Sequence, residues 1–314
     1  MTIPDISPGN PHRLTRKQHL FPAKSITRLY KDGCVDVFII GPMKRVRLNS
    51  TNPIFTANRA WDHVAERKTG SIERTFQRVV DYALSNPSSH ILDPEACVNV
   101  SAFYGLLINR ENVVDNPRQD TPFNGFVGLS EEPTQDTYEL YERLGIYSAR
   151  PLAAGGFGLP GRTLSGLMLF KGMDQFLMSN PNLVWAVCRA PENLEFIVPD
   201  RFAGMVDTRF YHHLTIPVGP SVALVADPSF VHHKQLEVWQ LGTINAMAKA
   251  VARRYYFSRN LDAALRLRRH TFIRVDADYP LTPPPYPLYR AASGQYPPAS
   301  AAYIAAAWTR SCAR

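Results

Sequence analysis

The sequence predicts an α+β fold in which a small antiparallel sheet is packed by several helices and a Pro-rich C-terminal tail follows. Three observations carry this prediction. Apolar residues recur at helical spacing through the first half of the chain, short β-branched runs fill much of the second half, and the end is dense in proline. The 314 residues, of which 45% are hydrophobic and 20% charged, suffice for one large globular domain or two small ones.

The N-terminal part of the chain predicts a loose segment and then a β-hairpin. Residues 1–13 are rich in Pro, Gly and Asn, which favours a flexible N-terminus. Lys31-Asp32-Gly33 is a turn signal, the run 34–40 is largely apolar and β-branched, and residues 45–48 alternate polar with apolar side chains. A hairpin formed by these two runs is therefore expected.

Helices are expected after the hairpin. Ser71 is a good N-cap and Glu73 in the first turn suits the helix dipole, so a helix is predicted from there until Asn86-Pro87 ends it. Residues 111–135 are polar and contain three prolines, which predicts a long loop. The helices expected in this half span about residues 71–86, 95–110, 134–144 (ended by Gly145) and 163–178.

The second half of the chain predicts the sheet and one long helix. A helix from about residue 236 to 258 has an apolar stripe that includes Leu241, Ile244 and Ala248. Four short runs rich in β-branched residues, separated by Pro, Asn, Asp and Gly, predict the small antiparallel sheet. These predicted strands cover residues 183–188, 194–198, 214–218 and 221–226.

The charge distribution separates a main domain from a basic tail. Residues 14–258 are predicted to form the main α+β domain, and residues 259–314 the tail. The net charge is +8: residues 1–30 carry five basic and one acidic side chain, the tail carries eight Arg and three Asp, and the part between is at −1. A basic end can bind nucleic acid or an anionic surface; the alternative is that the termini are simply solvated.

Cysteine usage and hydropathy predict a cytoplasmic protein that does not enter a membrane. The cysteines Cys34, Cys97, Cys188 and Cys312 are far apart and form no CxxC pair, which fits a reducing compartment better than a disulfide scaffold or a cysteine zinc site. No apolar run approaches the roughly 20 residues that span a bilayer. The first 22 residues also lack the apolar stretch of a signal peptide.

Several short motifs follow one another in a recognisable order over residues 14–258. They are Gln18-His19-Leu20-Phe21-Pro22, the hairpin after Asp32-Gly33, Ile72-Glu73, Trp185, Phe196–Asp200, Ile216-Pro217-Val218-Gly219-Pro220, Asn245 and Ala252-Arg253-Arg254-Tyr255. In this order they resemble a widespread bacterial family, domain-of-unknown-function family 4238. The family's opening His-His-x-x-Pro-like motif keeps only its second His here, and Pro199 replaces the Ser of a later Ser-Asp-x-Pro segment. The family is uncharacterised, so the resemblance implies no established activity.

Four polar residues fall on these family-like positions, namely His19, Asp200, Asn245 and Arg254. A His can serve as base, acid or metal ligand, and an Asp after a β-run could orient it or hold a metal. An Asn on the apolar face of a helix needs hydrogen-bond partners, since burying it unpaired costs about 1–3 kcal/mol, and Arg254 could pair with Asp200 or with a phosphate. We expect the four to converge on one catalytic or ligand site. The alternative is a buried hydrogen-bond network that fixes the N-terminal segment to the sheet and the last helix.

Other motifs favour simpler interpretations. The pairs His212-His213 and His232-His233, with Asp207 and Asp227 near them, indicate exposed loop histidines rather than a zinc site, because adjacent strand residues point to opposite faces. The Gly-rich stretch 154–161 lacks the Lys-Ser/Thr of a P-loop and the GxGxxG spacing, which favours a flexible loop before a helix. No GxSxG, HExxH or CxxC motif identifies a nucleophile or a metal site, and no motif indicates a cofactor.

Two classes of function follow, and the sequence leaves open whether the protein is an enzyme. Residues 253–269 combine Arg with Tyr, a pattern that can hold phosphates and stack bases. The first class is therefore a nucleic-acid-acting enzyme, a nuclease or a toxin-like effector, with His19 and Asp200 at its centre. The second is a non-catalytic binding or interaction protein, in which those residues hold the fold and the Pro-rich tail docks a protein partner.

Overall fold

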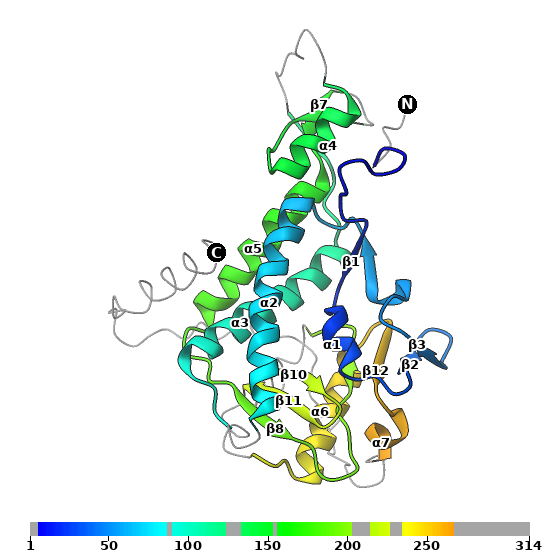
Figure 1. Ribbon diagram of the computed structural model, residues 1–314, viewed down its shortest axis with the longest axis vertical. Coiled ribbons are helices and arrows are strands. Elements are labelled where there is room, and N and C mark those ends of the chain that lie inside the picture. Colours follow the sequence, from blue (N-terminus) through cyan, green and yellow to red (C-terminus); the bar gives the residue numbers. More distant parts are fainter. Residues whose placement is uncertain are drawn as a thin grey trace, which may run out of the picture. The chain divides into compact units, whose positions relative to one another are not determined.

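The computed structural model of the protein describes residues 6–86, 90–123, 133–152, 156–202, 214–226 and 234–266 (Figure 1). The fold is α+β, with helices and several small antiparallel sheets, as predicted. Contacts divide the chain into two units. The first unit comprises Met1–Thr27, Asn49–Val79 and Asn99–Ser179, and the second comprises Arg28–Leu48, Val80–Val98 and Asn180–Arg314. The predicted main domain, 14–258, runs through both units.

The first unit begins with a short two-stranded sheet. Strand β1 (Lys17–His19) pairs antiparallel with β4 (Thr56–Asn58), and α1 (Ala23–Thr27) and the 3-10 turn η1 (Pro53–Phe55) lie between them in the sequence. Ahead of β1, Ser7 N–H donates to the carboxylate of Glu139 at 2.6 Å.

Three long helices follow, α2 (His63–Ser85), α3 (Pro94–Asp115) and α5 (Gly161–Ser179). Helix α2 ends where Asn86-Pro87 predicts, but it starts at His63 rather than near Ser71. The reason is Asp62, whose Oδ1 accepts a hydrogen bond from Ala65 N at 2.8 Å and so caps the first turn. The core of the first unit joins α2, α3 and α5 with the residue that follows β1 and with Trp61 ahead of α2, through the buried residues Leu20, Trp61, Ala65, Leu106, Val113 and Leu169.

Helix α4 (Gln135–Leu144) matches the predicted helix at both ends. Thr134 accepts from Thr137 N as the N-cap, and Gly145 takes the left-handed conformation (φ 86°) that ends the helix. The loop predicted over 111–135 instead contains the end of α3 and strand β5 (Thr121–Pro122). This strand forms a three-stranded sheet with β7 (Phe157–Leu159) and β6 (Arg150–Pro151), in the order β5-β7-β6.

Three of the four runs predicted for the small antiparallel sheet form one sheet in the second unit, whereas the run 194–198 reaches a strand only at Val198, in β9 (Val198–Pro199) of a different sheet. The sheet of the three runs has the strand order β10-β11-β8, formed by β10 (Leu214–Gly219), β11 (Val222–Ala226) and β8 (Ala186–Arg189). Every residue of β10 and β11 is buried, which explains their apolar, β-branched composition. Helix α6 (Val238–Val251) packs on this sheet (Figure 1), because Leu241 and Ile244 share a core with residues of β8 and β11.

A four-stranded sheet in the second unit corrects the prediction for the last helix. Its order is β3-β2-β12-β9, with β3 (Lys44–Leu48), β2 (Val35–Ile39), β12 (Tyr255–Ser258) and β9 (Val198–Pro199). The predicted hairpin is confirmed as β2 and β3. The helix predicted to run to residue 258 is wrong beyond Val251, because the following Tyr-Tyr-Phe-Ser segment is a buried strand. A short helix, α7 (Leu261–Leu265), follows with Asn260 as its N-cap.

Several predictions fall on residues outside the described ranges. They concern both His pairs with Asp207 and Asp227, part of the Gly-rich stretch, Cys312 and the tail beyond residue 266. Within the described ranges, Cys34, Cys97 and Cys188 are free thiols. No helix among the described residues is both long and apolar enough to cross a membrane.

Candidate functional site

His19 lies at the end of β1 in the first unit, with one ring nitrogen held by the backbone. Its Nε2 is 3.1 Å from the carbonyl oxygen of Ser50. A carbonyl oxygen can only accept a hydrogen bond, so in the neutral ring Nε2 carries the hydrogen and Nδ1 keeps its lone pair. The ring itself is partly exposed. His19 therefore leaves Nδ1 available for proton transfer.

The neighbouring Gln18 fixes β1 to the start of α2. Its side chain is fully buried and donates from Nε2 to Trp61 O at 2.9 Å, while its Oε1 accepts from Trp61 N at 3.2 Å. The amide side chain of Gln18 thus forms hydrogen bonds with both the N–H and the carbonyl group of Trp61, as the backbone of a neighbouring strand would. This double contact sets where Trp61 lies and, through it, the first turns of α2.

Glu66 is a carboxylate in an apolar setting on α2. Its Oε2 accepts a hydrogen bond from the indole Nε1 of Trp61 at 2.7 Å. Burial raises the pKa of Glu66, and this outweighs the lowering by the guanidinium of Arg110, the Trp61 hydrogen bond and the imidazole of His19. A carboxylate with a raised pKa is a stronger base than an exposed one.

Arg110 on α3 supplies a buried positive charge beside this carboxylate. Its side chain is only 1% exposed, it pairs with Glu73 one heptad beyond Glu66, and its guanidinium stands over the Trp61 ring at 5.5 Å. The Nε and Nη1 atoms of Arg110 have no hydrogen-bond partner among the described residues. We call His19, Glu66, Glu73 and Arg110 the acid–base cluster, because they combine an imidazole, two carboxylates and a guanidinium.

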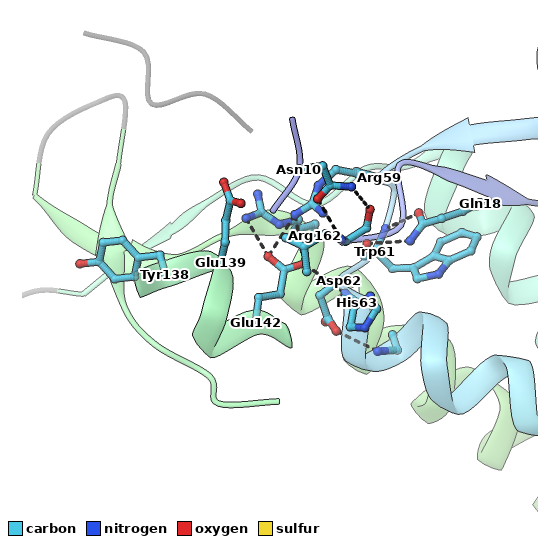
Figure 2. A network of polar contacts seen from close by, with 12 residues as sticks. Asn10, Gln18, Arg59, Trp61, Asp62, His63, Tyr138, Glu139, Glu142 and Arg162 are labelled. Atoms are coloured by element: carbon cyan, nitrogen blue, oxygen red, sulfur yellow. Dashed lines mark hydrogen bonds and ion pairs between the residues drawn. The ribbon is translucent and has the colours of Figure 1, made fainter. Parts of the chain in front are cut away.

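A second polar centre in the first unit is built around Glu142 of α4. Its two carboxylate oxygens lie 3.0 Å from Nη2 of Arg59, and its Oε2 lies 3.2 Å from Nη2 of both Arg150 and Arg162. Figure 2 shows the carboxylate of Glu142 meeting Arg59 and Arg162. Burial raises the pKa of Glu142, but the three guanidinium charges and the backbone N–H of His63 outweigh it and hold this pKa below its ordinary value. We call Glu142 with its three arginines the arginine cluster.

Two side chains at the start of α2 extend the arginine cluster. His63 accepts at Nε2 from Nη1 of Arg143 at 2.6 Å, and burial together with the charge of Arg143 lowers the pKa of His63. Burial raises the pKa of the neighbouring Asp62, whose Oδ2 is buried without a hydrogen-bond partner among the described residues. The segment from Arg59 to Glu66 supplies residues to both centres, Arg59 to the arginine cluster and Glu66 to the acid–base cluster.

Asp200 and Arg254, two of the residues predicted to form one site, are in contact in the second unit. Nε of Arg254 is 3.1 Å from Oδ2 of Asp200. The same carboxylate accepts from the backbone N–H groups of Arg253 (2.9 Å) and Arg254 (3.0 Å). The carboxylate of Asp200 therefore accepts hydrogen bonds from the backbone N–H groups between the end of α6 and the start of β12.

Asn245, also in the second unit, has a complete set of hydrogen bonds. Its Oδ1 accepts from Ile197 N at 2.9 Å, and its Nδ2 donates to Glu195 O at 2.8 Å and to Ala264 O at 3.1 Å. The side chain is buried, and none of these partners is Asp200 or Arg254. The structure thus brings Asp200 and Arg254 together, gives Asn245 separate partners, and places His19 in the first unit beside Ser50.

The basic and aromatic segment predicted to hold nucleic acid is partly internal. Tyr255 and Tyr256 are buried in β12, so a base could not stack on them in this conformation. Arg254 is paired with Asp200, and Arg259 is paired with Glu195 at 2.8 Å. Gly161, at the end of the Gly-rich stretch, donates its N–H to Asp120 at 2.8 Å, which places a carboxylate where a phosphate loop would bind its ligand.

Sequence reasoning missed Glu66, Arg110 and the arginine cluster. A heptad spacing between Glu66 and Glu73 on a helix, and one Arg inside the apolar stretch of α3, were the available signals for the first two. The arginine cluster has no local signal, because its members come from separate segments. Among the described residues, no group of three or more His, Cys, Asp or Glu has the arrangement of a metal site.

The chain matches no known protein family, no curated protein sequence and no solved structure. The resemblance to domain-of-unknown-function family 4238 therefore stays a prediction.

Proposed function

We propose that the protein is an enzyme that acts on nucleic acid, with His19 and Glu66 as a proton-transfer pair at a phosphodiester. One observation carries the proposal: a partly exposed imidazole with one nitrogen fixed by a backbone carbonyl lies in the electrostatic range of a carboxylate whose pKa is raised. An imidazole and a carboxylate with a raised pKa are the kinds of group that general acid–base catalysis uses.

The roles are assigned from the hydrogen bond of His19 and the raised pKa of Glu66. When a phosphodiester is cleaved, the attacking hydroxyl loses a proton and the leaving oxygen gains one. The carboxylate of Glu66 takes the first proton, and the imidazolium of His19 gives up the second from Nδ1, because Nε2 is engaged with Ser50. Arg110 stays buried and acts as a positioning residue, since its charge holds Glu73 and favours the ionised form of Glu66.

The test uses the full chain and fluorescently labelled RNA and single-stranded DNA, each with added Mg²⁺ and with a chelator. The wild-type protein should cleave one of the two polymers. His19→Gln keeps an amide donor for Ser50, and Glu66→Gln keeps an acceptor for Trp61, so both variants should fold. Each should lose roughly 100-fold or more of the rate, the usual contribution of a general acid or base.

The matched control is His12→Gln. His12 lies in the same unit and also faces a carboxylate, that of Asp136 at 2.7 Å, but it takes no part in the acid–base cluster. Its rate should equal that of the wild type. Failure of the wild type to cleave either polymer, or equal losses in His12→Gln and His19→Gln, would count against the proposal.

A second candidate is a non-catalytic binding protein, and the satisfied contacts of Asp200 and Asn245 support it. In that case the polar residues of the second unit stabilise the fold only. Retention on immobilised nucleic acid at increasing salt separates the two. Phosphate contacts make binding fall steeply with salt, whereas a flat response favours a partner other than nucleic acid.

A further inference from the structure

Helix α4 presents a charged face to the protein interior and an apolar face to solvent. Its buried side chains are those of Tyr138, Glu139 and Glu142, and Glu142 is the centre of the arginine cluster. Leu140 and Leu144, on the opposite face, are 39% and 60% exposed. A helix at the surface of a globular protein normally has the reverse arrangement, with its apolar side chains inward. The informative features here are therefore the buried carboxylates and the outward leucines.

The chain directly after α4 enlarges its apolar face. The N–H of Gly145 donates to Glu142 O at 3.2 Å, and the N–H of Ile146 donates to Tyr141 O at 2.8 Å, which is the Schellman arrangement of a helix C-terminus. This arrangement turns the residue after the glycine back toward the last turn of the helix. The side chain of Ile146 is 50% exposed. We call the three exposed apolar residues the α4 face, namely Leu140, Leu144 and Ile146.

Opposite charges lie at the two ends of the leucine row. Asp136 precedes Leu140 by four residues and Arg143 follows it by three, so the two charges are about two turns apart on the same flank of the row. The side chain of Asp136 is 65% exposed, and Arg143 is also exposed. Asp136 contacts His12 through Oδ1, and Arg143 contacts His63 through Nη1. Oδ2 of Asp136 and Nη2 of Arg143 take part in no hydrogen bond among the described residues, so both can pair with a further group.

We propose that the α4 face binds the same face of a second copy of the chain, with the two α4 helices antiparallel about a twofold axis near Leu140. Such an axis reverses the helix direction but keeps each flank on its own side, so it places Asp136 of one protomer beside Arg143 of its partner, and does so twice. A parallel pairing would bring no opposite charges to the same height. The charges on the flank therefore favour a second copy as the occupant of this face.

The association should be weak. The α4 face and its flanking charges comprise far fewer residues than a standard interface, so we expect a dissociation constant on the order of 10–100 μM. Sedimentation velocity of the full chain at increasing concentration should show a shift from monomer to dimer. A wild type that remains monomeric up to about 500 μM would assign the face to a different partner and overturn the proposal. The proposal goes beyond the catalysis proposed above and does not depend on it.

Leu144→Asp tests whether the α4 face forms the contact. It places a charge in the centre of the interface, so it should weaken association by roughly tenfold or more, and the exposure of Leu144 lets the variant fold normally. Met178→Asp is the matched control, because Met178 is another apolar residue of the first unit, on α5, and is 76% exposed. The control should associate as the wild type does. Equal weakening in the two variants, or none in Leu144→Asp, contradicts the proposal.

Charge reversal tests the antiparallel arrangement itself. Asp136→Lys alone and Arg143→Glu alone each bring like charges together, so each should weaken self-association by roughly tenfold. A mixture of the two variants restores both opposite-charge pairs across the twofold axis, and it should form a heterodimer about as well as the wild type forms its dimer. Thermal unfolding of each variant checks that its fold is kept. If the mixture associates no better than either variant alone, the antiparallel pairing is wrong and the proposal fails.

Discussion

Replacing Asn245 tests how strongly one buried amide stabilises the second unit. Asn245→Ala removes an acceptor for Ile197 N and two donors, for Glu195 O and Ala264 O, so three buried backbone groups lose their partner at once. At about 1 kcal/mol for each group, the lower end for an unsatisfied buried group, the loss is about 3 kcal/mol. For a chain of this size that lowers the melting temperature by roughly 6–12 °C.

The measurement is urea and thermal unfolding followed by circular dichroism, with Asn116→Ala as the control. The Asn116 side chain is exposed and bonds only to Asn112 one turn earlier, so its loss should stay within about 0.5 kcal/mol. Asn245→Asp adds a second comparison. It keeps an acceptor for Ile197 but turns a lone pair toward two carbonyl oxygens, so it should be at least as damaging as Ala at neutral pH. A loss below about 1 kcal/mol in Asn245→Ala would refute this account.

Three further predictions concern the first unit. Because the pKa of Glu142 is lowered in the folded state, its ionised form stabilises the fold above the ordinary pKa of 4.5, and this stabilisation is lost as the pH falls through the folded-state pKa. Melting temperatures recorded as the pH is lowered across this range should therefore drop more in the wild type than in Glu142→Gln. The raised pKa of Glu66 has the opposite effect on stability: its ionised form destabilises the fold at neutral pH, and this destabilisation disappears as the pH falls. Glu66→Gln should therefore melt no lower than the wild type at neutral pH, and a melting temperature several degrees lower would contradict this. Gly158→Ala would bring a Cβ within 2.2 Å of Thr121 O and should cost about 1–3 kcal/mol in urea unfolding, whereas Gly41→Ala, with no atom within 4 Å, should cost little.

Locally encoded elements of the fold could be predicted from the sequence, and elements that depend on distant contacts could not. Helix α4 carries its own signals, Thr134 at one end and Gly145 at the other, so both bounds were predicted. The strand β12 continues an apolar pattern that also suits a helix. What makes it a strand is its pairing with β2 and the carboxylate of Asp200 on the preceding backbone, and neither contact leaves a local trace.

The candidate site, too, was predictable only where a local sequence pattern marks its residues. His19 could be selected because it lies in the family-like motif Gln18-His19-Leu20-Phe21-Pro22, between a basic segment and Pro22. The charged groups near His19 could not be predicted, because Glu66 and Arg110 look like ordinary charged positions until α2 and α3 are packed and burial changes the pKa of Glu66. Asn245 was correctly predicted to need buried partners, since an amide on an apolar helix face has no other way to be satisfied.

The pairing of β2 with β12 has a consequence for how the chain is made. Ile39 lies opposite Tyr255, so 216 residues (255 minus 39) separate the two partners in the order of synthesis. At about 5–20 residues per second, a ribosome needs roughly 10–40 s to supply the second strand after the first. During that time the β2–β3 hairpin has left the ribosome with its inner edge unpaired, and such an edge is a template for association with another chain. Until β12 is synthesised, this edge of β2 has no partner strand.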